Sequence, residues 1–115
     1  MHNTLCSTGD IFKTSSTNLS ALGLVPKYKR DIPISQLVVD RNPKSMIAES
    51  FRALRSNMQF ISNTPGPKIA AVTSTVSGEG KTFIAINLAG IIAFTGKKVV
   101  IIDLDMRKPK IHIGF

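Results

Sequence analysis

Several residue types are scarce in this chain of 115 residues, and each scarcity excludes a class of structure or function. There is no tryptophan and only one cysteine, Cys6, so an internal disulfide is excluded and a reducing compartment is indicated. Aromatic residues make up 6% of the chain and do not alternate with basic ones. A surface that stacks nucleic-acid bases is therefore not expected.

Long apolar segments are missing as well. The chain does not begin with a basic stretch followed by an apolar core, so no secretory signal is indicated. The longest apolar run, residues 83–94, is interrupted by Asn87 and is shorter than the ~20 residues of a membrane helix. These features predict that the chain as given is soluble and cytosolic.

Basic residues, in contrast, are abundant. The chain has 15 Lys and Arg against 7 Asp and Glu, a net charge of +8, and the excess is concentrated in residues 41–68, with five basic residues and one acidic. Such a charge fits polyphosphate ligands, acidic partners, nucleic acid or anionic lipid without choosing among them. The length and the 43% hydrophobic content fit one small globular domain at most.

The first part of the chain predicts little regular structure. Residues 1–20 are rich in Ser, Thr and Asn, and Pro26 and Pro33 interrupt the short apolar segments that follow. We therefore expect residues 1–44 to form a flexible linker and the regular elements to lie in residues 45–115.

A helix is predicted over residues 45–62. Ser45 can accept a hydrogen bond from a first-turn N–H, and apolar residues then recur at alternating steps of four and three. These residues are Ile47, Phe51, Leu54, Met58 and Ile61. Glu49 and Arg52 project away from this stripe and Arg55 lies at its flank, so a charged face is available to a partner. Alternatively, this face is simply solvated and carries one ion pair.

The remaining residues predict a β-α-β unit, which makes the fold class α/β. The short apolar run 68–74 fits a strand buried on both faces, and a helix over 81–95 should end at Gly96. A second buried strand is expected over 98–104. The two strands would be parallel and joined by a right-handed crossover.

The loop at 75–82, Thr-Val-Ser-Gly-Glu-Gly-Lys-Thr, carries the strongest chemical signal. Backbone N–H groups at the positive end of a helix bind phosphate; the ammonium of Lys81 would contact the β and γ phosphates, and the Thr82 hydroxyl would ligate magnesium. The first glycine of the standard pattern is replaced by Thr75. The predicted nucleotide-binding residues are Thr75, Val76, Ser77, Gly78, Glu79, Gly80, Lys81, Thr82 and Phe83.

A dinucleotide-binding fold explains this loop less well. Phe83 stands where that fingerprint has its third glycine, and the pair Lys81 and Thr82 has no role in it. ATP with Mg²⁺ is therefore the predicted cofactor pair.

Two aspartates follow the second predicted strand. Asp103 and Asp105 would point to the same side of the strand end, where they can hold magnesium through water and one can accept the proton of an attacking hydroxyl. Arg107 can stabilise phosphate charge. Alternatively, the aspartates form a solvated strand end or pair with Arg107 and Lys108. The predicted catalytic residues are Lys81, Asp103, Asp105 and Arg107, and the predicted metal ligands are Thr82, Asp103 and Asp105.

Three segments, Glu49–Arg55, Thr73–Thr82 and Val99–Arg107, share their order and spacing with one family. In these segments the chain resembles the bacterial protein-tyrosine kinases of capsule and exopolysaccharide export, within the division-site and partition ATPase superfamily. The resemblance implies a P-loop NTPase fold that transfers a phosphoryl group from ATP with magnesium to tyrosine. It is more specific than the phosphate loop alone.

The resemblance also implies partners. Glu49, Arg52 and Arg55 match a Glu-x-x-Arg-x-x-Arg helix through which family members form homo-oligomeric rings. A membrane-embedded polysaccharide export component, fused or separate, and a tyrosine-bearing protein substrate are implied at the inner face of the cytoplasmic membrane. The second acidic motif and tyrosine tail of the family would lie beyond Phe115, so the expected match is the N-terminal part of a kinase domain, and the β-α-β unit is expected to be an incomplete P-loop NTPase fold.

Two alternatives stay open. One is a partition-like or cluster-carrier ATPase, although Val76 replaces the signature lysine of partition ATPases. The other is a truncated, non-catalytic module for nucleotide binding or oligomerisation. Two parallel strands with one crossover helix leave both faces of the sheet uncovered, so this chain is not expected to fold stably alone.

Overall fold

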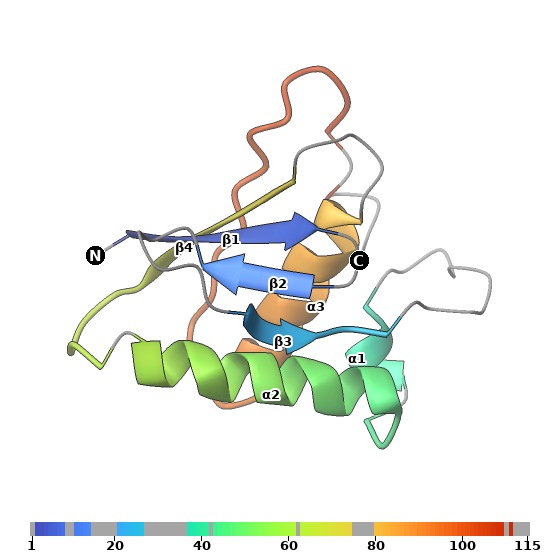
Figure 1. Cartoon of the computed structure of the whole chain (residues 1–115). Helices are drawn as coiled ribbons and strands as arrows, with labels where there is room; N and C mark the ends of the chain where they lie inside the picture. Colours follow the sequence, from blue (N-terminus) through green and yellow to red (C-terminus); the bar gives the residue numbers. More distant parts are fainter. Residues whose placement is uncertain are drawn as a thin grey trace.

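The computed structural model describes residues 2–8, 11–14, 21–26, 37–41, 43–61, 63–74, 80–109 and 111. In chain order the elements are β1 (His2–Thr8), β2 (Ile11–Thr14), β3 (Ala21–Leu24), α1 (Val38–Arg41), α2 (Met46–Ile61), β4 (Ile69–Ser74) and α3 (Lys81–Ala93). The strands form one sheet, α3 lies beside β4 and α2 runs past the β3 end of the sheet (Figure 1). None of the helices described is both long and apolar enough to cross a bilayer.

The sheet has the strand order β3-β2-β1-β4. β1 pairs with β2, and β2 with β3, in antiparallel fashion. β1 also pairs with β4 in parallel, so that Leu5 lies opposite Val72. β4 is therefore the last strand of the sheet, with one paired edge.

The prediction of a linker over residues 1–44 is wrong for the part of it that the structure describes. That part contains three strands and the short helix α1. β1 supplies the backbone partners of β4, and β3 places Leu22 in the core. The mean polarity of a segment cannot reveal such a partner, because strand pairing joins residues that are far apart in the sequence.

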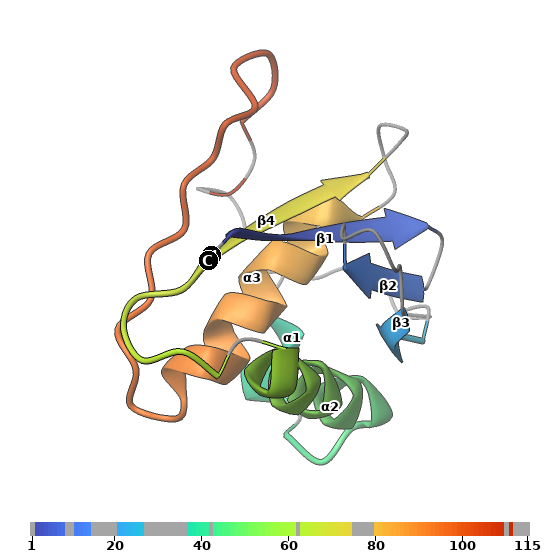
Figure 2. The same ribbon diagram turned by 60° about the vertical axis from the view of Figure 1, so that its left-hand side comes forward.

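The predicted strand over 98–104 is also wrong. These residues have no regular secondary structure, and none of them forms a backbone–backbone hydrogen bond with another described residue. The side chains of Val100, Ile102 and Leu104 are each at least 73% exposed. β1 pairs with one edge of β4, and the segment after α3 runs past the sheet without pairing with the other edge (Figure 2).

The complete β-α-β unit is consequently absent from the described residues, and only its first strand and its helix remain. β4 is not buried on both faces as predicted, since Ile69 is 62% exposed. A strand at the edge of a sheet is covered less than a central one, and no described strand lies beyond β4.

The helix predicted over 45–62 corresponds to α2, Met46–Ile61. The hydroxyl oxygen of Ser45 accepts a hydrogen bond of 3.2 Å from the N–H of Ala48, which caps the first turn. Of the apolar stripe, Phe51 and Leu54 are fully buried, whereas Ile61 at the end of the helix is exposed. The stripe thus packs into the core along most of its length.

The helix predicted over 81–95 corresponds to α3, Lys81–Ala93. It ends in a turn over residues 94–96, where the N–H of Gly96 donates a hydrogen bond of 2.9 Å to the carbonyl of Ala93. Gly96 has a φ of 81°, a conformation that glycine adopts without strain. The helix therefore stops two residues earlier than predicted, with Phe94 as its C-cap and Gly96 two residues further along the chain.

One polar side chain, Asn87 of α3, is completely buried in the core. Its Oδ1 accepts hydrogen bonds from the N–H groups of Val38, at 2.9 Å, and Val39, at 3.2 Å. Its Nδ2 donates to the carbonyl of Phe83 at 2.8 Å. Asn87 therefore satisfies the first two amides of α1 and attaches them to α3.

The backbone of α3 lies close to the same segment. A Cβ atom placed on Gly90 would be 2.5 Å from Cδ1 of Leu37, a separation that real Cβ atoms essentially never show. Gly90 therefore leaves room for the end of the Leu37 side chain, which would have to move if position 90 carried a larger residue.

Replacing Asn87 with leucine should lower the free energy of unfolding by about 2–4 kcal/mol, because two buried N–H groups would lose their acceptor. Urea unfolding followed by circular dichroism measures this loss. The exposed Asn63 offers a matched control, and Asn63→Leu should change stability by less than about 0.5 kcal/mol. Equal, small losses for both variants would contradict the role given to Asn87.

Candidate nucleotide-binding site

The amino end of α3 begins at a glycine with an unusual backbone conformation. Gly80, the residue before the helix, has φ 83° and ψ 21°, and its carbonyl accepts a hydrogen bond of 3.0 Å from the N–H of Ile84. A Cβ at position 80 would meet nothing within 4 Å. Glycine is therefore favoured here by the left-handed backbone rather than by a lack of space.

Lys81 and Thr82 form the first turn of α3 and are half-buried. Described residues provide no side-chain cap for this helix end. The first N–H groups of a helix have no acceptors within the helix, and its dipole makes this end positive. An ammonium, a hydroxyl and backbone donors are thus gathered at one point.

The ring of Phe83 turns inward. It packs against the ring of Phe51 in α2, with 6.3 Å between the ring centroids and a tilt of 58°. The half-buried aromatic side chain packs against the hydrophobic core, so its predicted part in nucleotide binding would fall to its backbone. The other predicted loop residues, 75–79, lie outside the described part of the chain.

The two predicted catalytic aspartates lie in the irregular segment after α3. Asp103 accepts hydrogen bonds from the N–H groups of Asp105, at 3.0 Å, and Ile111, at 3.3 Å. Asp105 accepts from the N–H groups of Arg107 and Lys108, both at 3.1 Å. The carboxylates therefore stabilise turns of their own segment, and Arg107 and Lys108 approach Asp105 through their backbones.

The position of this segment agrees only partly with the prediction. Because no strand forms, the two aspartates do not share one side of a strand end. Both views nevertheless show the segment running back from the end of α3 toward the end of the molecule where α3 begins (Figures 1 and 2). Within the described ranges, no group of three His, Cys, Asp or Glu side chains is arranged to hold a metal.

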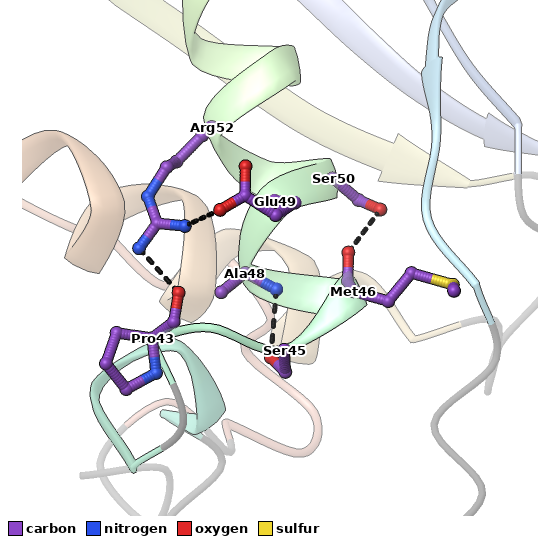
Figure 3. A network of polar contacts seen from close by, with 7 residues as sticks. All are labelled: Pro43, Ser45, Met46, Ala48, Glu49, Ser50 and Arg52. Carbon is purple, nitrogen blue, oxygen red and sulfur yellow. Dashed lines mark hydrogen bonds and ion pairs between the residues drawn. The ribbon is translucent and has the colours of Figure 1, made fainter.

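The predicted association residues of α2 have different surroundings. Arg52 donates hydrogen bonds to the carboxylate of Glu49 and, at 2.7 Å, to the carbonyl of Pro43 (Figure 3). Glu49 is exposed and Arg52 is half-buried, so this pair is at the surface. Arg55 instead donates to the carbonyl of Ile91 in α3, at 3.0 Å, and is half-buried.

Sequence reasoning missed two of these roles. It treated Asn87 as an interruption of an apolar run and Arg55 as part of an open face. The signal for Asn87 was present, since a lone amide among apolar residues of a helix needs a buried partner. The partner of Arg55 left no signal, because it is a backbone carbonyl of another helix.

The region around this helix matches a known protein family. Residues 70–113 match the CbiA family, the CobQ/CobB/MinD/ParA nucleotide binding domain. The chain is 45% identical over 73 residues, 64% of its length, to the tyrosine-protein kinase YwqD of Bacillus subtilis strain 168. It is 42% identical over 87 residues, 76% of its length, to the putative tyrosine-protein kinase CapB of Staphylococcus aureus.

A third relative is the tyrosine-protein kinase wzc of Salmonella typhi, 36% identical over 88 residues, 76% of this chain. The predicted resemblance to bacterial tyrosine-protein kinases is confirmed. The matched regions make up 31% of YwqD, 38% of CapB and 12% of wzc, so the chain spans a minor part of each relative. No solved structure matches the chain.

Replacing Gly80 with alanine should lower the free energy of unfolding by about 1–2 kcal/mol, because an L-residue is strained in the left-handed region. Gly96→Ala is the matched comparison, since Gly96 has a similar φ of 81° and equally open surroundings. Thermal and urea unfolding should show similar losses for both variants. A loss at Gly96 without one at Gly80 would contradict the backbone conformation at the start of α3.

Proposed function

We propose that this chain is the ATP-binding part of a protein-tyrosine kinase, which transfers a phosphoryl group from ATP with magnesium to tyrosine. The observation that carries the proposal is a helix that begins at Gly80, Lys81 and Thr82 inside the segment matched by a nucleotide-binding domain. The names of the relatives support the kinase rather than another nucleotide-dependent activity.

The helix end would bind the phosphates. The N–H groups of its first turn would donate to phosphate oxygens, and the dipole of α3 would favour their negative charge. Lys81 would add an ammonium beside the β and γ phosphates, as the lysine of a phosphate loop does. Together these groups would hold the phosphoryl group in place for attack.

Three of the predicted site residues carry oxygen donors that suit magnesium. Thr82 offers a hydroxyl, and Asp103 and Asp105 offer carboxylates, the oxygen ligands that magnesium prefers. When bound, magnesium would neutralise phosphate charge. One of the two aspartates would accept the proton of the attacking tyrosine hydroxyl, and Arg107 would stabilise the charge that develops on phosphate.

The proposal includes a cellular setting. Glu49 and Arg52 form a charged surface on α2, through which copies of the chain would associate into a ring together with Arg55. The kinase would act on tyrosine-bearing protein substrates at the inner face of the cytoplasmic membrane. There it would regulate capsular or exopolysaccharide synthesis, together with a membrane-embedded export component.

Lys81→Met should weaken binding of an ATP analogue about tenfold or more, because a charge-assisted bond to phosphate is lost. Lys97→Met is the matched control. Lys97 is exposed in the segment just after α3, so its loss should change the dissociation constant less than about twofold. Titration calorimetry with a non-hydrolysable ATP analogue and magnesium measures both. Equal affinities for Lys81→Met and the unchanged chain would refute a phosphate site at α3.

Incubation with ATP and magnesium should produce phosphotyrosine on a tyrosine-containing polymer or on the chain itself, and Lys81→Met should abolish it. Mass spectrometry identifies the product, and Lys97→Met should retain it. ATP hydrolysis that requires Lys81 without any phosphotyrosine would support the partition-like or cluster-carrier ATPase. Binding with neither reaction would support a non-catalytic nucleotide-binding module.

A further inference from the structure

The carboxyl end of α3 has a carbonyl that the chain after the helix does not satisfy. The carbonyls of Gly90, Ile92 and Ala93 accept hydrogen bonds from N–H groups of the turn over 94–96. Among the described contacts, the carbonyl of Ile91 receives no N–H from this turn and accepts the guanidinium of Arg55 instead.

Arg55 suits this carbonyl in charge as well as in position. The last turn of α3 contains no basic residue, although the carboxyl end of a helix is its negative end. The guanidinium supplies the missing positive charge from a different helix. Because Arg55 is half-buried, this bond is less exposed to competition from water than a bond at the open surface.

A second contact joins the same two helices near the opposite end of α3. Phe51 precedes Arg55 by four residues, so both side chains lie on one face of α2. The ring of Phe51 packs on Phe83, two residues after Lys81. Phe83 and Ile91 are about 12 Å apart along the helix axis. α2 therefore holds α3 at two separate points, one at each end.

We propose that Arg55 is a positioning residue, which sets the orientation of the phosphate-binding end of α3 from α2. With Arg55 bound to Ile91, α3 cannot pivot about the contact between Phe51 and Phe83. Without this bond, the carboxyl end of α3 would be held to α2 less firmly, and the resulting change in the tilt of the helix would alter the position of Lys81. Arg55 would then link the two helices within one chain, in addition to its place beside Glu49 and Arg52 on the proposed association surface.

This link would also regulate the site, a consequence that rests on the proposed function. On α2, Arg52 lies about one turn before Arg55 and Glu49 lies nearly two turns before it. Association of copies through these two residues would shift α2, and the shift would reach Lys81 through the two contacts with α3. Nucleotide affinity would therefore depend on the association state of the chain.

Amide hydrogen exchange on the chain without nucleotide tests the positioning role. Arg55→Met should accelerate exchange of the Ile84 amide, which forms the first bond of α3 with Gly80, about three- to tenfold. Arg55→Lys, which keeps a donor and the charge, should restore most of the protection. Gln59→Met, an exposed change on the same helix, should have no effect.

Two exchange patterns would overturn the proposal. Faster exchange confined to the last turn of α3 would make Arg55 a local cap only. A uniform increase that includes Leu54 in α2 and Val72 in β4 would indicate general loss of stability. If Arg55→Met does not fold, Arg55→Lys tests the positioning role instead. Because its ammonium is shorter than the guanidinium, the exchange rate of the Ile84 amide should still increase selectively, but less.

Nucleotide binding tests the functional consequence separately. Arg55→Met should raise the dissociation constant of the ATP analogue about three- to tenfold, and Gln59→Met should not. An unchanged constant in Arg55→Met, with the Lys81→Met effect intact, would refute the link while leaving the proposed function standing. If the unchanged chain binds no nucleotide, the proposed function is wrong. The positioning role of Arg55 is then tested by the amide-exchange pattern alone.

Discussion

The buried amide of Asn87 is the interaction on which the rest of this structure depends. Its oxygen serves the first two N–H groups of α1 while its nitrogen serves a carbonyl of α3. Val38 and Val39, whose side chains are buried, are held against α3 by these bonds. A buried amide that lost either partner would cost more than the bond itself contributes, which makes this junction specific.

The orientation of α3 matters because its two ends have different tasks. The amino end presents Gly80, Lys81 and Thr82, and the carboxyl end receives Arg55. Between them, one face of the helix contacts α1 through Asn87 and α2 through Phe83. A helix fixed at several points along its length is well suited to hold a phosphate group in a constant position, since small displacements weaken such contacts strongly.

Much of the helical structure could be predicted from the sequence, including which predicted site residues begin α3. The spacing of Phe51 and Leu54 and the cap at Ser45 are local signals, and they correspond to α2 as observed. The position of Gly80 just before a helix was likewise predicted from local signals. The strands were harder to predict, because a strand is stable only when another part of the chain pairs with it.

The sequence by itself therefore determined where α2 and α3 lie and which residues stand at the amino end of α3, because capping and periodicity act within a few residues. Only the tertiary structure showed that β1 pairs with β4, that residues 98–104 remain outside the sheet and that Arg55 reaches Ile91. Each of these depends on segments far apart in the sequence. Their pairing follows from competition among all possible partners in the folded chain, which no local pattern records.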